Sequence, residues 1–249
     1  MKTLVLSCNT GEGHNSCANA IKQYYEDHGE VCDVADSLGL FSPMVSNMIS
    51  KWHVRIYRYT PKLFNKGYNL LENHPRLSNE RSGIYRLISL GAKKLAEYIK
   101  KGGYDAVICT HVISSSMLTY TMEHYDLRLS ATSLLMTDYT CHPMASDSKL
   151  DIFFIPDASL KEEFVYRGVP RETLVKSGIP VRRAFYTKTP KTEAKAHFDI
   201  PANSSHLLVM CGSMGCGPIR ALARSVAESL PENSYMTVCC GRTSVSSRS

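Results

Sequence analysis

The sequence predicts an α/β fold built on a parallel sheet, and two observations carry this prediction. First, short apolar runs alternate with stretches of helical length from the first residues onward. The runs of the first two thirds of the chain lie at residues 2–8, 30–36, 104–111, 131–138 and 151–157. Strands separated by helix-length segments are typical of parallel sheets with helices on both faces. Second, a glycine turn follows the first run and leads into a predicted helix over residues 15–28, as in Rossmann-like folds.

The composition describes an ordinary folded protein. Its 249 residues are 43% hydrophobic and 21% charged, and the net charge of +6 permits an acidic partner such as an anionic membrane or a nucleotide. No stretch approaches the ~20 apolar residues of a membrane span, and the apolar start is too short for a signal peptide. The nine cysteines are odd in number and form no C-x-x-C pair. We therefore expect a cytoplasmic protein with reduced thiols.

The chain divides into two predicted domains. Residues 180–205 carry three prolines, are rich in lysine and threonine, and separate two apolar regions. We expect a first domain over residues 1–186, a linker over 187–205, and the start of a second domain over 206–249. The last part reads as strand, glycine turn, helix and strand, which is short for a domain of at least about 50 residues. A serine-rich end leaves the final strand uncovered, so the second domain is predicted to be incomplete or to be covered by a partner chain.

The glycine turn contains a histidine that needs an explanation. Gly11 and Gly13 allow a tight turn whose backbone amides, at a helix N-terminus, can face an anion. His14 follows directly. Because the helix dipole disfavours a charged ring there, a neutral imidazole that can accept a proton is expected. His14 is therefore a candidate general base, and the alternative is a capping or solvent-facing histidine.

The same turn allows a second class of function. A dinucleotide-binding loop would read G-x-G-x-x-G, but Ser16 occupies the third small position. Asp33 or Asp36 could bind a ribose at the end of the second strand. A nucleotide-dependent oxidoreductase is thus an alternative. A Ser-His-Asp hydrolase is disfavoured because the sequence has no G-x-S-x-G elbow.

Polar residues also follow two later strands. Asp138 and His142 lie after the fourth run, where sites cluster in open α/β sheets. For His111, Ser114 and Ser115, after the third run, helix capping is the preferred interpretation. The spacing around His142 fits no standard zinc pattern, so neither a metal nor a cofactor is expected.

A basic stretch suggests contact with a membrane. Residues 41–71 contain no acidic side chain, and a helix is predicted from Pro43 to just before Pro61. Apolar side chains including Met48, Ile49 and Trp52 occupy one sector of this helix. The adjacent sector holds Lys51, Arg55 and Arg58. This pattern is typical of an interfacial helix. The alternative is a helix packed on the sheet with a solvated basic face. No nucleic-acid-binding module accompanies the stretch, so nucleic acid is not expected as a partner.

Several motifs together resemble one known family. GEGHNSCANAI at residues 11–21, TDYTCHP at 137–143 and SGIPVRRAF at 177–185 resemble the diacylglycerol glycosyltransferases, as does the segment at 151–170. These enzymes include monogalactosyldiacylglycerol synthases and processive diacylglycerol glucosyltransferases. The resemblance implies the two-domain GT-B glycosyltransferase architecture, with the lipid acceptor mainly on the first Rossmann-like domain and the UDP-sugar mainly on the second.

The resemblance also implies roles for individual residues. It implies inverting hexose transfer from a UDP-sugar to diacylglycerol at the inner face of the membrane, with His14 as the base or beside it. Gly11, Gly13, Asp138 and His142 would lie on the acceptor side. The donor side would include the residues that follow: Gly212, Ser213 and Arg242. Later segments that hold the nucleotide and the sugar in the family have no counterpart here, so a truncated, inactive lipid-binding relative is an alternative.

Overall fold

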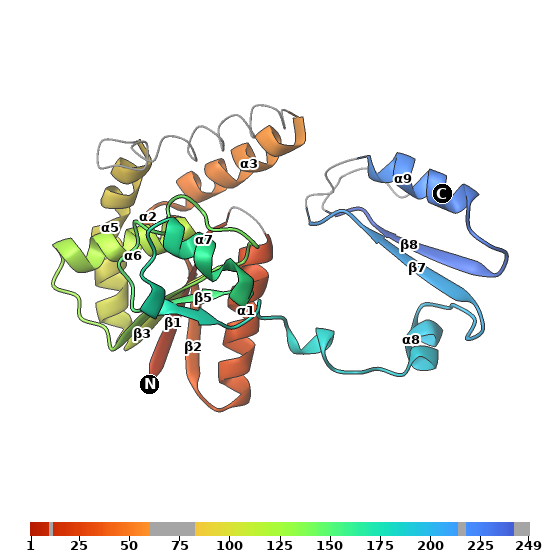
Figure 1. The fold of residues 1–249 in the computed structure, drawn as a ribbon, viewed down its shortest axis with the longest axis horizontal. Coiled ribbons are helices and arrows are strands. Elements are labelled where there is room, and N and C mark those ends of the chain that lie inside the picture. Colours follow the sequence, from red (N-terminus) through yellow and green to blue (C-terminus); the bar gives the residue numbers. More distant parts are fainter. Residues whose placement is uncertain (10–11, 60–82, 214–217, 242–249) are drawn as a thin grey trace. The chain divides into compact units, whose positions relative to one another are not determined.

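The structure is a computed structural model that describes residues 1–9, 12–59, 83–213 and 218–241. The chain forms two compact units (Figure 1). Residues 1–53 group with those up to Tyr186, and residues 54–59 group with those from Thr187 onward.

The first unit is built on a six-stranded parallel sheet with the strand order β2-β1-β3-β4-β5-β6. Its strands are β1 (Lys2–Ser7), β2 (Val31–Asp36), β3 (Ala106–Cys109), β4 (Ala131–Leu135), β5 (Ile152–Ile155) and β6 (Leu174–Lys176). The first five confirm the apolar runs predicted from the sequence. The short edge strand β6 was not predicted.

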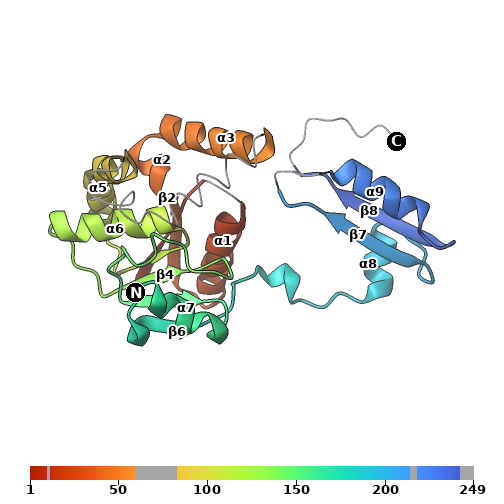
Figure 2. The same ribbon diagram turned by 45° about the horizontal axis from the view of Figure 1, so that its top comes forward.

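Side chains of the sheet alternate between two cores, and helices cover both faces (Figure 2). Leu4 and Leu6 of β1 enter the larger core, whereas Val5 enters the smaller one. The smaller core includes buried side chains of α1 (Glu12–Asp27). The larger core lies under the helices α2 (Ser37–Phe41), α5 (Gly83–Gly102), α6 (Val112–His124) and α7 (Lys161–Tyr166). The two-faced covering follows because apolar residues occupy successive positions of each strand.

Helix α3 (Pro43–Tyr59) begins at Pro43, as the sequence predicts. The predicted end before Pro61 lies outside the described residues. Ser46 is buried and its hydroxyl donates to Asp36, which also caps α2 by accepting from the Leu38 amide at 3.2 Å. These bonds anchor the start of α3 to the carboxyl end of β2.

The second unit contains α8 (Lys191–His197), β7 (Ser205–Met210), α9 (Ile219–Glu228) and β8 (Ser234–Cys239). β7 and β8 pair in parallel, so this part has the predicted strand, helix and strand. The segment predicted as a linker contains α8. Single 3-10 turns lie at Ala158–Leu160, Arg171–Thr173 and Arg183–Phe185.

The strand order determines where a site can form. β1 lies between β2 and β3 in the sheet. From the carboxyl end of β1 the chain continues to β2 on one side, whereas from the carboxyl end of β3 it continues to β4 on the other side. Crevices at such a switch point are the usual binding places of open α/β sheets. The loops after β1, β3 and β4 all open at this edge (Figure 1).

Candidate functional site at the sheet's carboxyl edge

His14 lies where the ends of three strands meet. It stands in the first turn of α1, after β1, and its side chain is half-buried. Its Nδ1 is 2.6 Å from the backbone carbonyl oxygen of Thr110, which follows β3. The Thr137 hydroxyl, after β4, is 3.1 Å from the same nitrogen. The ring is thus held by contacts from two loops that are distant in sequence.

A second histidine ring packs against His14. His111 caps α6, as predicted, because its Nδ1 accepts a hydrogen bond from the Ile113 amide at 3.1 Å. Its ring also meets the ring of His14 edge-on, with 4.5 Å between the centroids. The sequence predicted the cap and missed this contact. The capping prediction was wrong for Ser114 and Ser115, because both lie inside α6, where they are buried and their hydroxyls donate to backbone carbonyls at 3.1 and 2.9 Å.

The loop after β4 carries the two predicted acceptor-side residues. Asp138 is exposed, and His142 is half-buried with its Nδ1 accepting from the Met144 amide at 3.2 Å. Burial lowers the pKa of His142, Asp138 opposes this effect, and His14 lowers the pKa further. His142 thus lies within electrostatic range of both Asp138 and His14. At neutral pH His142 is therefore an uncharged ring.

Glu163 of α7 fixes the same loop in place. One carboxylate oxygen accepts from the Thr140 hydroxyl at 2.7 Å and from the Cys141 amide at 2.8 Å. These bonds, with help from Arg167, hold the pKa of Glu163 below its usual range. The carboxylate thus stays charged and ties the loop to α7. Sequence reasoning did not single out Glu163.

The remaining acceptor-side and donor-side residues lie in two glycine turns. Gly13 is exposed in the first turn of α1, and a Cβ there would meet no described atom within 4 Å. Gly212 and Ser213 form a turn after β7 in the second unit, and Gly212 has a φ of 68° that favours glycine. The sequence predicts that the backbone amides of these two turns face an anion. Gly11 and Arg242 lie outside the described residues.

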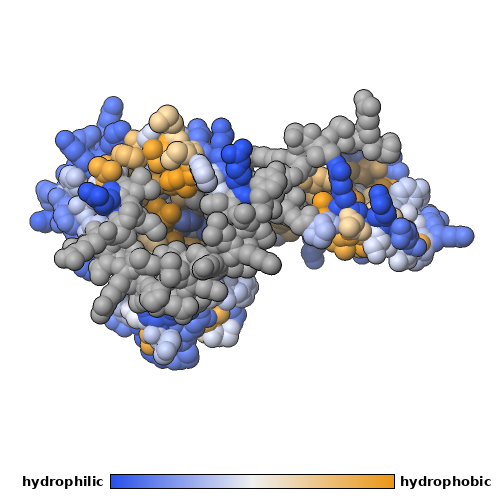
Figure 3. Space-filling view, turned by 90° about the horizontal axis from the view of Figure 1, so that it is seen from above, coloured by the Kyte–Doolittle hydropathy of each residue, from blue (hydrophilic) through white to orange (hydrophobic). Residues whose placement is uncertain are grey.

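The exposed face of α3 combines cations with large apolar side chains. Lys51 and Arg55 are exposed. So are Met44, Met48 and Trp52, with 77%, 51% and 59% of their surface accessible. Figure 3 views the molecule from the side on which α3 lies in Figure 1 and shows hydrophobic side chains gathered beside hydrophilic ones on the first unit. The side chain of Arg58 lies outside the described part.

The predicted apolar sector of α3 is divided between two environments. Ile49 packs against the larger core of the sheet, whereas Met48 and Trp52 face outward. The helix therefore packs on the fold along one side and still presents an amphipathic surface on the other. This arrangement combines elements of the two interpretations that the sequence left open.

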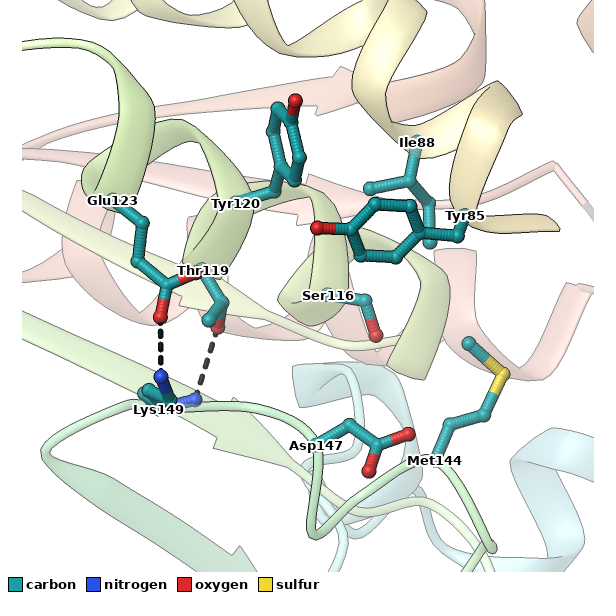
Figure 4. A pocket seen from close by; sticks show the side chains of 9 residues that line it. All are labelled: Tyr85, Ile88, Ser116, Thr119, Tyr120, Glu123, Met144, Asp147 and Lys149. Atoms are coloured by element: carbon teal, nitrogen blue, oxygen red, sulfur yellow. Dashed lines mark hydrogen bonds and ion pairs between the residues drawn. The ribbon is translucent and has the colours of Figure 1, made fainter. Parts of the chain in front are cut away.

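A separate pocket of about 140 Å³ lies between α5, α6 and the loop after β4 (Figure 4). Lys149 reaches Glu123 at 2.5 Å at one end, and its amide bonds to the Thr119 hydroxyl at 3.0 Å. The rest of the pocket lining is formed by Tyr85, Ile88, Ser116, Tyr120, Met144 and Asp147. The lining includes none of the site residues predicted from the sequence.

Within the described ranges, no group of three or more histidine, cysteine, aspartate or glutamate side chains is arranged to hold a metal ion. Among the helices of that same part of the chain, none has the length and apolar character to cross a membrane.

Comparison with known proteins adds a family match. The sequence profile described as monogalactosyldiacylglycerol (MGDG) synthase matches residues 14–181. The matched segment includes His14 and the whole loop that carries Asp138 and His142.

Individual relatives are similar along most of this chain. It is 25% identical over 243 residues to the processive diacylglycerol beta-glucosyltransferase of Bacillus cereus (strain B4264), covering 97% of this chain and 60% of that protein. It is 25% identical over 261 residues to a probable chloroplastic monogalactosyldiacylglycerol synthase of Glycine max, covering 97% and 47%. The chain thus spans about half to three fifths of the length of these relatives.

Solved structures share the fold at low sequence identity. One is Anabaena HepE in complex with UDP, with 12% identity, a TM-score of 0.51 and coverage of 96% of this chain and 60% of that one. Another is the UDP-GlcNAc 2-epimerase of Neisseria meningitidis bound to UDP-GlcNAc, with 11% identity, a TM-score of 0.53 and coverage of 98% and 66%. These similarities confirm the predicted α/β, Rossmann-like parallel-sheet fold of the GT-B type.

Proposed function

Because the chain belongs to the monogalactosyldiacylglycerol synthase family, we propose that it takes part in glycolipid synthesis by transferring a hexose from a UDP-sugar to diacylglycerol. The observation that carries this proposal is the family match over residues 14–181, which contains the whole cluster around His14. The names of the relatives, a diacylglycerol glucosyltransferase and a monogalactosyldiacylglycerol synthase, support the choice of hexose and acceptor.

His14 is the proposed general base. It takes the proton from the free hydroxyl of diacylglycerol while that oxygen forms a bond to the anomeric carbon of the sugar. The bond from the anomeric carbon to the diphosphate breaks, and its electron pair leaves with UDP. A single displacement of this kind inverts the configuration at the anomeric carbon. The Asp138 carboxylate, which favours positive charge on His142, is proposed to lie on the acceptor side of the same site.

The proposed donor side lies in the second unit. The backbone amides of the turn at Gly212 and Ser213 suit the diphosphate of a UDP-sugar, with Arg242 as a further partner. We propose that a partner chain covers the sheet of β7 and β8, because most side chains of β7 are exposed among the described residues. UDP-sugar is a substrate here, and the proposed chemistry needs no separate cofactor.

The exposed face of α3 supports work at a membrane surface. Lys51 and Arg55, with Arg58 beside them in sequence, would face anionic lipid while Trp52 enters the headgroup boundary. We therefore propose a cytoplasmic protein, peripheral at the inner face of the membrane.

The test is sugar transfer by the 249-residue chain. Radiolabelled UDP-glucose and UDP-galactose are offered with diacylglycerol in anionic liposomes. We expect labelled glycolipid, and a loss of about a hundredfold to ten thousandfold in rate for His14→Ala, the usual contribution of a general base. His28→Ala is the matched control, because His28 is exposed just beyond the other end of α1. An unchanged rate for His14→Ala would refute its role as base.

A relative that binds lipid without transferring sugar is the second candidate, and the exposed apolar and basic side chains of α3 favour it. Pelleting the liposomes in the same tube separates the two. Pelleting with transfer supports the enzyme, and pelleting without transfer supports the lipid-binding relative. The family match favours glycosyl transfer over the nucleotide-dependent oxidoreductase, and none of the observations above supports the oxidoreductase.

A further inference from the structure

The contacts of His14 determine which of its two nitrogens carries the proton. The Thr110 carbonyl oxygen lies 2.6 Å from Nδ1, and a carbonyl oxygen can only accept a hydrogen bond. Nδ1 must therefore be the protonated nitrogen. In a neutral ring the lone pair then lies on Nε2. Within the described residues, Nε2 of His14 has no hydrogen-bond partner.

Thr137 provides a second contact to the same nitrogen. Its hydroxyl oxygen is 3.1 Å from Nδ1, and because Nδ1 donates, this oxygen accepts part of a three-centre hydrogen bond. The carbonyl and the hydroxyl come from loops after β3 and β4, so together they limit rotation of the ring as well as its tautomer. The edge-on ring of His111, 4.5 Å away, limits the ring further.

We propose that Thr137 is a positioning residue for His14, which acts with the Thr110 carbonyl to hold the ring as the Nδ1–H tautomer with Nε2 as the proton-accepting atom. The catalytic part of this statement rests on the proposed function, whereas the tautomer is a property of the chain itself. When Nε2 takes a proton, the two oxygen acceptors on Nδ1 stabilise the resulting cation, since hydrogen bonds from a charged donor are stronger. Thr137 therefore acts on chemistry more than on binding.

The first test needs no enzymatic activity. The 249-residue chain is labelled with ¹⁵N-histidine, and its imidazole nitrogens are observed by NMR at about pH 8, where histidine of ordinary basicity is neutral. The spectrum of His14→Ala identifies the His14 signals among those of the nine histidines. We expect Nδ1 at the position of a protonated nitrogen and Nε2 at that of an unprotonated one. The opposite pattern would overturn the proposal.

Variants of Thr137 isolate the contribution of its hydroxyl. Thr137→Val keeps the shape and loses the hydroxyl, and we expect the ratio of the two tautomers to fall about fivefold, the effect of one ordinary hydrogen bond. Thr137→Ser retains the hydroxyl and should restore the original signals. Thr140→Val is the control, because it removes a hydroxyl bond to Glu163 in the same loop without touching His14. Equal tautomer ratios in Thr137→Val and the unmodified chain would refute the role of Thr137.

Where transfer is detected, the same variants give a second readout. Thr137→Val should lower kcat about fivefold and leave KM for diacylglycerol unchanged, and Thr137→Ser should restore kcat. A rise in KM with kcat unchanged would show that Thr137 binds the acceptor instead. If the tautomer results hold and no transfer occurs, the proposed function fails while the assignment of the tautomer stands.

Discussion

Glu163 ties the loop of Asp138 and His142 to α7. Its carboxylate accepts two hydrogen bonds from that loop, which lowers its pKa in the folded state below the ordinary 4.5. A carboxyl group with a lower pKa in the folded than in the unfolded state stabilises the fold above the unfolded pKa. That contribution is lost as the pH falls through the folded pKa.

We therefore expect Glu163→Gln, which keeps an acceptor oxygen but no charge, to lower the free energy of unfolding by about 1 to 2 kcal/mol at neutral pH. Urea unfolding from about pH 7 to about pH 3.5 checks this. The difference between the two proteins should be constant at the upper end and shrink below about pH 4.5. Glu162→Gln is the matched control, since Glu162 is exposed and pairs with Arg171. A deficit independent of pH would show that the charge of Glu163 is not what holds the loop.

At this scale the sequence predicts some residues of the site and misses others for a clear reason. His14 is identifiable because it directly follows a glycine turn, and His111 because it precedes a helix. Thr110 acts through its backbone carbonyl, which any residue type provides. Thr137 and Glu163 act through partners that only the fold brings near, 123 and 22 residues away in sequence.

At the scale of elements, one side of α3 packs on the fold and another is exposed to solvent. Ile49 and Ser46 attach it to the first unit, and the opposite side exposes Trp52, Lys51 and Arg55. Each cation near an anionic surface contributes about 1 kcal/mol to binding. We therefore expect the double variant Lys51→Gln/Arg55→Gln to bind anionic liposomes about 25-fold more weakly, measured by sedimentation over a range of lipid concentrations.

The matched control changes the same number of charges on another helix. Lys100 and Lys101 are exposed in the last turn of α5, and their double glutamine variant should keep most of the affinity. Raising the salt concentration should reduce the difference between the α3 variant and the unmodified chain, because salt screens exposed charges. Equal weakening by both double variants would indicate attraction by net charge alone and would contradict an oriented helix.

The strands show which parts of the sheet can be predicted from hydrophobic patterns in the sequence. The first five strands of the sheet could be predicted because each lies within an apolar run of the sequence, although only Cys32 of β2 is buried. β6 escaped prediction because it has only three residues, two of them exposed, at the edge of the sheet. Helix α8 escaped as well, since its seven residues contain no buried side chain and thus no apolar pattern.

At the scale of the whole molecule, thiols distinguish the two units. Cys32, Cys109 and Cys141 of the first unit are buried, and burial raises the pKa of each, that of Cys32 to about 11 and that of Cys141 to about 12. Cys239 and Cys240 of the second unit are exposed. The thiolate is the reactive form, so we expect iodoacetamide to modify the exposed pair at least about tenfold faster.

Peptide mapping by mass spectrometry over a time course measures these rates. A parallel reaction in concentrated urea is the control, and there the buried and exposed thiols should react at similar rates. Rapid native modification of Cys109 would contradict the buried position of β3.

The strand order also determines when neighbouring strands can pair while the chain is being synthesised. β1 leaves the ribosome well before its neighbour β3, because Thr3 pairs with Ala106, which is made about a hundred residues later. At roughly 5–20 residues per second, the nascent chain spends about 5 to 20 s with the β3-facing edge of β1 unpaired. During that interval an apolar strand is available for wrong pairings, so a chaperone that holds the emerging chain would raise the yield of native protein.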